Sequence, residues 1–137
     1  MAPQEFGTVR YEGIHCNLSI RQFPEGVVLL EISGTDVGEF GDAPMRALNE
    51  CLTGVGPIRL FIDAREVRGT SIEVSGEWAR WLHNNKVQLR DISMLTGSRL
   101  IEITADFVRR FSSLEGTMRI YTDEAEFDQA LAAAIRP

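Results

Sequence analysis

Alternating apolar and polar side chains predict β-strands in the first quarter of the chain. Residues 14–21 alternate with a period of two, which is typical of a strand with one buried face. The tripeptide at 24–26, Pro-Glu-Gly, favours a turn. Residues 27–32 are apolar on both faces at their start, as in a central strand. The pattern therefore predicts a hairpin over 14–34, to which residues 9–11 add a short edge strand.

After residue 34 a three- to four-residue period alternates with short apolar runs. Helices are expected to start near Asp42, Thr70, Ser98 and Asp123, and buried strands at 58–63, 92–95 and 118–121. Strands separated by helices pair in parallel through crossover connections. The chain is thus predicted to be one α/β domain over residues 1–137. It has a mixed, largely parallel sheet of four to five strands and about four helices.

The helix starts carry clear capping chemistry. Residues 70–73, Thr-Ser-Ile-Glu, match a capping box with Thr70 as the cap, and residues 123–126 match a second one with Asp123 as the cap. Asp42 and Ser98 are plausible caps of the first and third helices. Gly76 is expected to weaken the second helix by about 1 kcal/mol relative to alanine.

Apolar stripes indicate which helix faces pack on the sheet. The third helix has one at Leu100, Ile103, Phe107, Phe111 and Leu114, and the last helix has one at Phe127, Ala130, Leu131 and Ala134. Trp78 and Trp81 share a face of the second helix, which we expect to lie against the sheet. The alternative is that one tryptophan is exposed, as an anchor for a partner or a wall for an apolar ligand.

Composition narrows the class of protein. The 137 residues include 14 Lys+Arg and 20 Asp+Glu, a net charge of −6, which argues against nucleic acid as a partner. No secretory signal is visible, and the longest apolar run, 130–135, is too short to insert in a membrane. We therefore expect a cytoplasmic protein whose two cysteines, Cys16 and Cys51, are reduced and serve packing.

Three segments resemble the STAS domains of bacterial anti-sigma-factor antagonists. Residues 28–36 (VLLEISGTD) look like the strand and turn that open that domain, and 58–67 (IRLFIDAREV) are similar to its central strand. Residues 120–131 resemble its last strand and helix. The resemblance implies a non-catalytic regulatory module that binds a protein partner, such as a kinase-like anti-sigma regulator.

The same resemblance implies a switch by phosphorylation at the start of the second helix. That position is Thr70-Ser71 here, although the usual Asp-Ser-Ser-Gly signature is replaced by Gly-Thr-Ser-Ile. A helix N-terminus stabilises a phosphate, whereas Glu73 would repel it, and plain capping is the alternative role. Arg65, Arg68, Trp78 and Trp81 are the interaction candidates.

The sequence contains no catalytic or metal-binding motif. His15 and Cys16 are neighbours on a strand and point to opposite faces, so they form no dyad, and no metal-ligand spacing or cofactor motif occurs. Polar residues gather where the predicted strands end, at Asp36, Asp63, Arg65, Thr70, Ser71, Thr96, Ser98 and Asp123.

Three classes of function remain. We expect the regulatory interaction module, with a small-molecule or lipid-binding module as the alternative. That alternative predicts an apolar pocket between helix and sheet. An enzyme is the third. A homodimer through an apolar helix face or an edge strand suits any of them.

Overall fold

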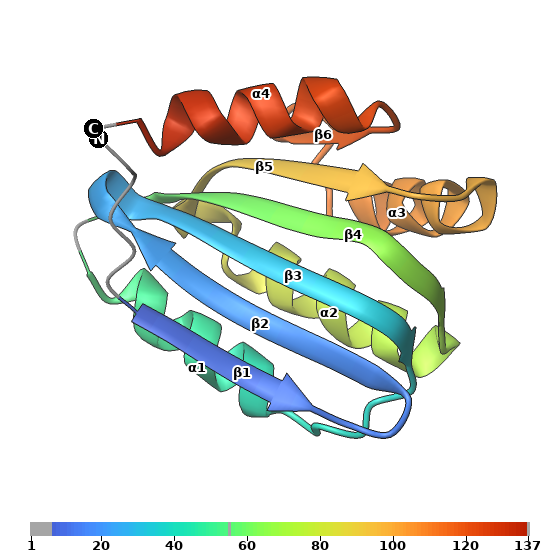
Figure 1. Ribbon diagram of the computed structural model, residues 1–137. Coiled ribbons are helices and arrows are strands. Elements are labelled where there is room, and N and C mark those ends of the chain that lie inside the picture. Colours follow the sequence, from blue (N-terminus) through green and yellow to red (C-terminus); the bar gives the residue numbers. More distant parts are fainter. Residues whose placement is uncertain (1–6, 55, 137) are drawn as a thin grey trace.

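A six-stranded mixed sheet forms the centre of the protein, in a computed structural model that describes residues 7–54 and 56–136 (Figure 1). The strands lie in chain order, and their bounds are β1 Gly7–Glu12, β2 Cys16–Phe23, β3 Val27–Asp36, β4 Ile58–Thr70, β5 Leu89–Thr96 and β6 Met118–Tyr121. The four α-helices are α1 Ala43–Leu52, α2 Ile72–Asn84, α3 Arg99–Phe111 and α4 Glu124–Ala134. Short 3₁₀ turns occupy Pro24–Gly26 and Lys86–Gln88.

The strand pairing follows the connections. β1, β2 and β3 are antiparallel neighbours, whereas β3, β4, β5 and β6 are parallel, because β4, β5 and β6 are each reached through a helix. The α/β class, the mixed sheet and the four helices are confirmed. The expectation of four to five strands was wrong: β1 forms a full edge strand paired along its length with β2.

Helices cover the two faces of the sheet unequally. Apolar side chains of α1, α2 and α3 join those of β2 to β6 in one core, which contains the fully buried Leu30, Leu48 and Leu60. On the other face α4 alone packs through Phe127 against a smaller cluster with Phe61 and Leu95 (Figure 1). The stripe predicted on the last helix is therefore confirmed.

Helix caps agree with the sequence at three of the four starts. The Ser98 hydroxyl accepts the N–H of Ile101 at 3.3 Å, and the Asp123 carboxylate accepts that of Glu126 at 3.1 Å. Asp42 stands at the cap position of α1 without a capping hydrogen bond. The prediction of Thr70 as the cap of α2 was wrong. Ser71 caps the helix, because β4 continues through Thr70 in register with Asp36 of β3.

One glycine sets the path of the chain into α3. A Cβ at Gly97 would collide with the backbone carbonyl oxygen of Arg65 on β4. Only glycine lets the loop after β5 pass this close to the neighbouring strand. The start of α3 is thereby held against the end of β4, next to the site described below.

The stripe predicted to bury α3 is wrong for four of its five residues. Leu100, Ile103, Phe107 and Phe111 are exposed by 62%, 54%, 54% and 57%, and only Leu114 is buried. The helix packs instead through the adjacent face, with Ile101, Ala105 and Val108. Both faces of α3 are apolar. The face with the smaller side chains meets the sheet, because α2 shares the space above β4 and β5.

Candidate functional site

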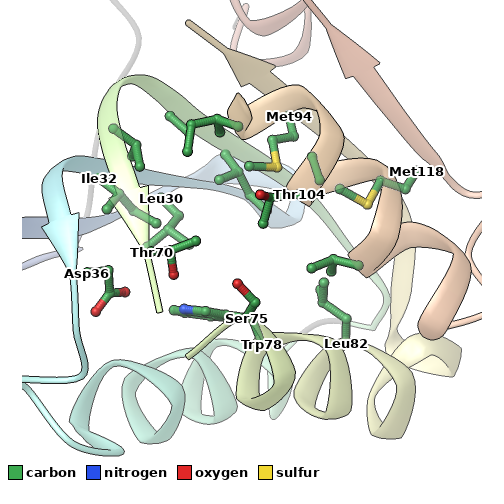
Figure 2. A pocket seen from close by; sticks show the side chains of 16 residues that line it. Leu30, Ile32, Asp36, Thr70, Ser75, Trp78, Leu82, Met94, Thr104 and Met118 are labelled. Atoms are coloured by element: carbon green, nitrogen blue, oxygen red, sulfur yellow. The ribbon is translucent and has the colours of Figure 1, made fainter. Parts of the chain in front are cut away.

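A cavity of about 90 Å³ lies between the sheet and the paired helices α2 and α3 (Figure 2). The two helices are tied near their C-terminal ends, where the buried Ser112 hydroxyl donates to the carbonyl of Ala79 at 2.9 Å. Twelve of the sixteen side chains that line the cavity are apolar. The lining consists of Leu30, Ile32, Asp36, Ile62, Ala64, Val67, Thr70, Ser75, Trp78, Leu82, Met94, Ile101, Thr104, Ala105, Val108 and Met118.

The polar lining is concentrated at the end where β3 and β4 finish. Figure 2 shows Asp36, Thr70 and Ser75 toward one side of the cavity, with Leu82, Met94 and Met118 away from them. Asp36 and Ser75 are each only 8% exposed. The cavity therefore combines an apolar body with one polar end, the usual composition of a small-ligand site.

Both candidate switch residues lie at this polar end. Thr70 lines the cavity, and the next residue, Ser71, accepts the N–H of Val74 with its hydroxyl at 3.1 Å. The backbone N–H of Ser71 donates to the carbonyl of Asp36 at 3.0 Å. Glu73 is exposed and forms no capping bond, so the start of α2 is open to a further anion except for the charge of that carboxylate.

The two tryptophans separate into one core residue and one cavity residue. Trp81 is buried and donates its indole N–H to the side-chain oxygen of Asn49 on α1 at 2.9 Å. Trp78 is half-buried, meets Trp81 edge to face with ring centroids 6.3 Å apart, and lines the cavity. Trp81 thus belongs to the core and Trp78 packs against it, as the prediction that favoured a core role expected, and Trp78 also lines the cavity.

The exposed apolar residues of α3 border the same cavity. Thr104 lines it and stands one turn from Leu100 and one turn from Phe107 on the helix surface. The rings of Phe107 and Phe111 stack with centroids 5.8 Å apart. We call Leu100, Ile103, Phe107 and Phe111 the α3 stripe. Four large apolar side chains exposed by about half form a patch of roughly 400–500 Å² at about 200 Å² each, at the upper end for a monomer surface.

The candidate Arg65 lies on the opposite face of the sheet. Its guanidinium bonds Asp63 at 3.0 Å and reaches Asp128 of α4. The bond to Asp128, followed by that to Asp63, raises the pKa of Arg65 despite partial burial. Arg68 is exposed near the end of β4 and has no ion pair among the residues that the structure describes. These two arginines are therefore not brought together with the tryptophans into one site.

The cysteines are buried and separate. Burial, then Asp36 and Glu39, raises the pKa of the Cys16 thiol to about 11, and burial also raises the pKa of Cys51. A raised pKa disfavours the nucleophilic thiolate. Within residues 7–54 and 56–136 no group of His, Cys, Asp and Glu could hold a metal ion, and no helix has the length and apolar character to cross a membrane.

Sequence reasoning missed Ser75, which with Asp36 is one of the two buried polar residues that line the cavity. A signal was present, because Ser75 falls on the same side of the helix as Ala79 and Leu82, where an apolar residue is expected. Met94 and Met118 were assigned to strands, but only the tertiary structure shows that they line this space.

Comparisons with known proteins place the fold. No family model and no curated protein matches the sequence. An uncharacterised protein of the DUF3478 family with a SpoIIAA-like fold, from Shewanella loihica, has a TM-score of 0.63 at 16% identity, over 88% of this chain and 98% of that one. An anti-sigma factor antagonist from Mycobacterium paratuberculosis has a TM-score of 0.55 at 12% identity, over 91% and 94%. The chain thus has the SpoIIAA-like fold.

Proposed function

We propose that the chain is a non-catalytic regulatory module that binds a protein partner through the α3 stripe. The observation that supports this most directly is the exposure of two stacked phenylalanines, Phe107 and Phe111, on a helix that packs through its other face. Such a patch on a monomer surface is unfavourable unless it is covered, and aromatic residues are typical interface anchors. The likeness in fold to an anti-sigma factor antagonist supports a partner protein as the occupant.

The negative charge of the chain indicates which charged residues the partner would carry. The chain carries a net charge of −6, and Glu73 and Glu77 on the exposed surface of α2, on its side toward α1, have no ion pair among the described residues. On α3 itself, Asp106 is already paired with Arg109 and Arg110. A partner segment with apolar residues flanked by Lys or Arg would suit this surface. The proposed setting is the cytoplasm, and a kinase-like anti-sigma regulator is the model for the partner.

A photo-crosslinking amino acid at position 107 tests this proposal. We expect it to capture one protein in the native cell, and the purified pair should bind with an affinity that falls at least tenfold in Phe107→Ser. Val87→Ser, which changes a side chain 87% exposed in a separate turn, is the matched control and should bind normally. Equal binding by both variants would exclude the α3 stripe as the docking surface.

The switch is a further part of this proposal. A phosphate on Thr70 or Ser71 would add a charge of about −1.5 to −2 at the start of α2, beside the cavity and Glu73. Because the added negative charge attracts Lys and Arg, we expect Ser71→Asp or Thr70→Asp to tighten binding of a basic-flanked partner, with Ser71→Asn and Thr70→Asn as uncharged controls. If both acidic variants bind as the parent chain does, the switch is refuted.

A second candidate function, favoured by the cavity itself, is the binding of a small apolar ligand, including a lipid chain. The cavity of about 90 Å³ between α2, α3 and the sheet is the pocket that this alternative requires. Native mass spectrometry of protein taken from its own cell should then show a retained ligand. Displacement of that ligand by Ala105→Leu, which places a larger side chain in the cavity, would locate it there.

A further inference from the structure

The polar end of the cavity contains a hydroxyl that nothing in the fold satisfies. Ser75 is 8% exposed, and its hydroxyl has no hydrogen-bond partner among residues 7–54 and 56–136. In Figure 2 this oxygen is directed into the cavity rather than back along α2. This oxygen is not fully enclosed, so the hydroxyl is free to bond a group that enters the cavity.

The neighbours of Ser75 at this end are hydrogen-bond acceptors. Asp36 is also 8% exposed, and one of its oxygens accepts the N–H of Gly38 at 3.0 Å, which leaves the acceptor capacity of the second oxygen. The Thr70 hydroxyl donates to the carbonyl of Ser71 at 3.4 Å, so its lone pairs remain as acceptors. Asp36 and Thr70 therefore favour a group that supplies the proton of the hydrogen bond, whereas the Ser75 hydroxyl can donate or accept.

An anionic group is disfavoured at the same place. No Lys, Arg or His lines the described cavity, and the charged side chain present is the Asp36 carboxylate. A ligand carboxylate or phosphate would be buried beside a like charge without a counter-ion, which is strongly unfavourable. The remaining lining, from Leu30 to Met118, is apolar and suits a hydrocarbon body.

The size of the cavity limits this body. A volume of about 90 Å³ is smaller than the engineered apolar cavity of about 150 Å³ that binds benzene. A short aliphatic chain fits without movement of the helices. A longer one would have to extend out of the cavity.

We propose that the cavity binds a small molecule with a short apolar body and a hydrogen-bond donor at one end, a hydroxyl or an amine, and that it excludes the corresponding carboxylate. The donor lies between Asp36, Thr70 and Ser75, and the body lies against Leu82 and the two methionines. This inference rests on the second proposed function, the binding of a small ligand in the cavity.

Four probes that each contain a four-carbon chain test the inference by nuclear magnetic resonance titration of the full protein. We expect 1-butanol and butylamine to bind at least tenfold more tightly than butyl methyl ether, which has no donor, and butanoate, which is anionic. The shifted amides should cluster at residues 36, 70 and 75. Separate curves for the alcohol and the amine show which donor is preferred.

Two variants connect this preference to the named side chains. Asp36→Asn keeps an oxygen that can accept from Gly38, and it should raise butanoate affinity relative to butylamine at least tenfold. Ser75→Ala should weaken 1-butanol several-fold. Asp42→Asn, on the exposed start of α1, and Ser33→Ala, on the opposite face of the sheet, are the matched controls and should change neither value.

The outcomes distinguish failure of this inference from failure of the proposed small-ligand function. Equal affinity for all four probes, with shifts at the cavity, would overturn the donor preference and leave small-ligand binding supported. Tighter binding of butanoate would overturn it as well. Absence of shifts at the cavity with every probe would overturn both the inference and the small-ligand function, while the protein-docking proposal would be unaffected.

Discussion

Filling the cavity with a larger side chain tests whether this space is open in the folded protein. Ala105 is 2% exposed, lies on α3 and lines the cavity, so Ala105→Val directs two additional methyl groups into it. A cavity of about 90 Å³ costs about 2 kcal/mol at roughly 24 cal/mol per Å³ of unfilled volume. This value is the upper limit of what a filling substitution can recover.

The expected gain is smaller than that limit. Two buried methyl groups contribute about 1.6 kcal/mol at about 0.8 kcal/mol each. The lower helix propensity of valine relative to alanine subtracts about 0.6 kcal/mol. We therefore expect the free energy of unfolding to rise by about 1 kcal/mol, which corresponds to a Tm increase of roughly 3–6 °C for a domain of this size.

Urea denaturation and calorimetry measure the change, and Ala79→Val provides the control. Ala79 is fully buried on α2 but does not line the cavity, so the same substitution should overpack the core and destabilise it by about 1–3 kcal/mol. If Ala105→Val destabilises the protein as much as Ala79→Val does, the space is closed in solution. Both proposals that use the cavity would then lose their physical basis.

Three further predictions concern α4, the buried thiol and the α3 stripe. Arg65→Met removes the link between β4 and α4 and should lower the free energy of unfolding by about 1–2 kcal/mol, whereas Arg46→Met, at an exposed ion pair, should change it by less than about 0.5 kcal/mol in urea titrations. Burial raises the pKa of the Cys16 thiol to about 11, so the unfolded chain loses this proton first as the pH rises above 9; stability should fall by about 1–2 kcal/mol between pH 9 and 11, and Cys16→Ala should remove most of that fall. A thermal scan of Phe107→Ser should show a loss of about 1 kcal/mol in unfolding free energy, because about half of this ring is exposed and the helix packs through its other face; a loss above about 3 kcal/mol would mean that the ring belongs to the core.

Local patterns in the sequence were sufficient for most of the secondary structure. The two-residue period at 14–21 and the apolar run at 58–63 place β2 and β4 because strand side chains alternate between two faces. The Asp123 cap and the stripe containing Phe127 place α4 for a similarly local reason. The error at Thr70 was also local in origin. Two adjacent hydroxyl residues can both cap a helix, and pairing with Asp36 on another strand selects Ser71.

The site depended on information that no local pattern contains. α3 has two apolar faces, and the sequence cannot state which of them meets the sheet, because that depends on the space left by α2. Ser75 and Asp36 are 39 positions apart in the sequence, and they reach one cavity only when β3, β4 and α2 are assembled. The sequence by itself determined an α/β domain and its helix starts, since these follow from periodicity and capping. The tertiary structure decided the exposed stripe and the polar-ended cavity, because both result from how helices of fixed shape share one face of the sheet.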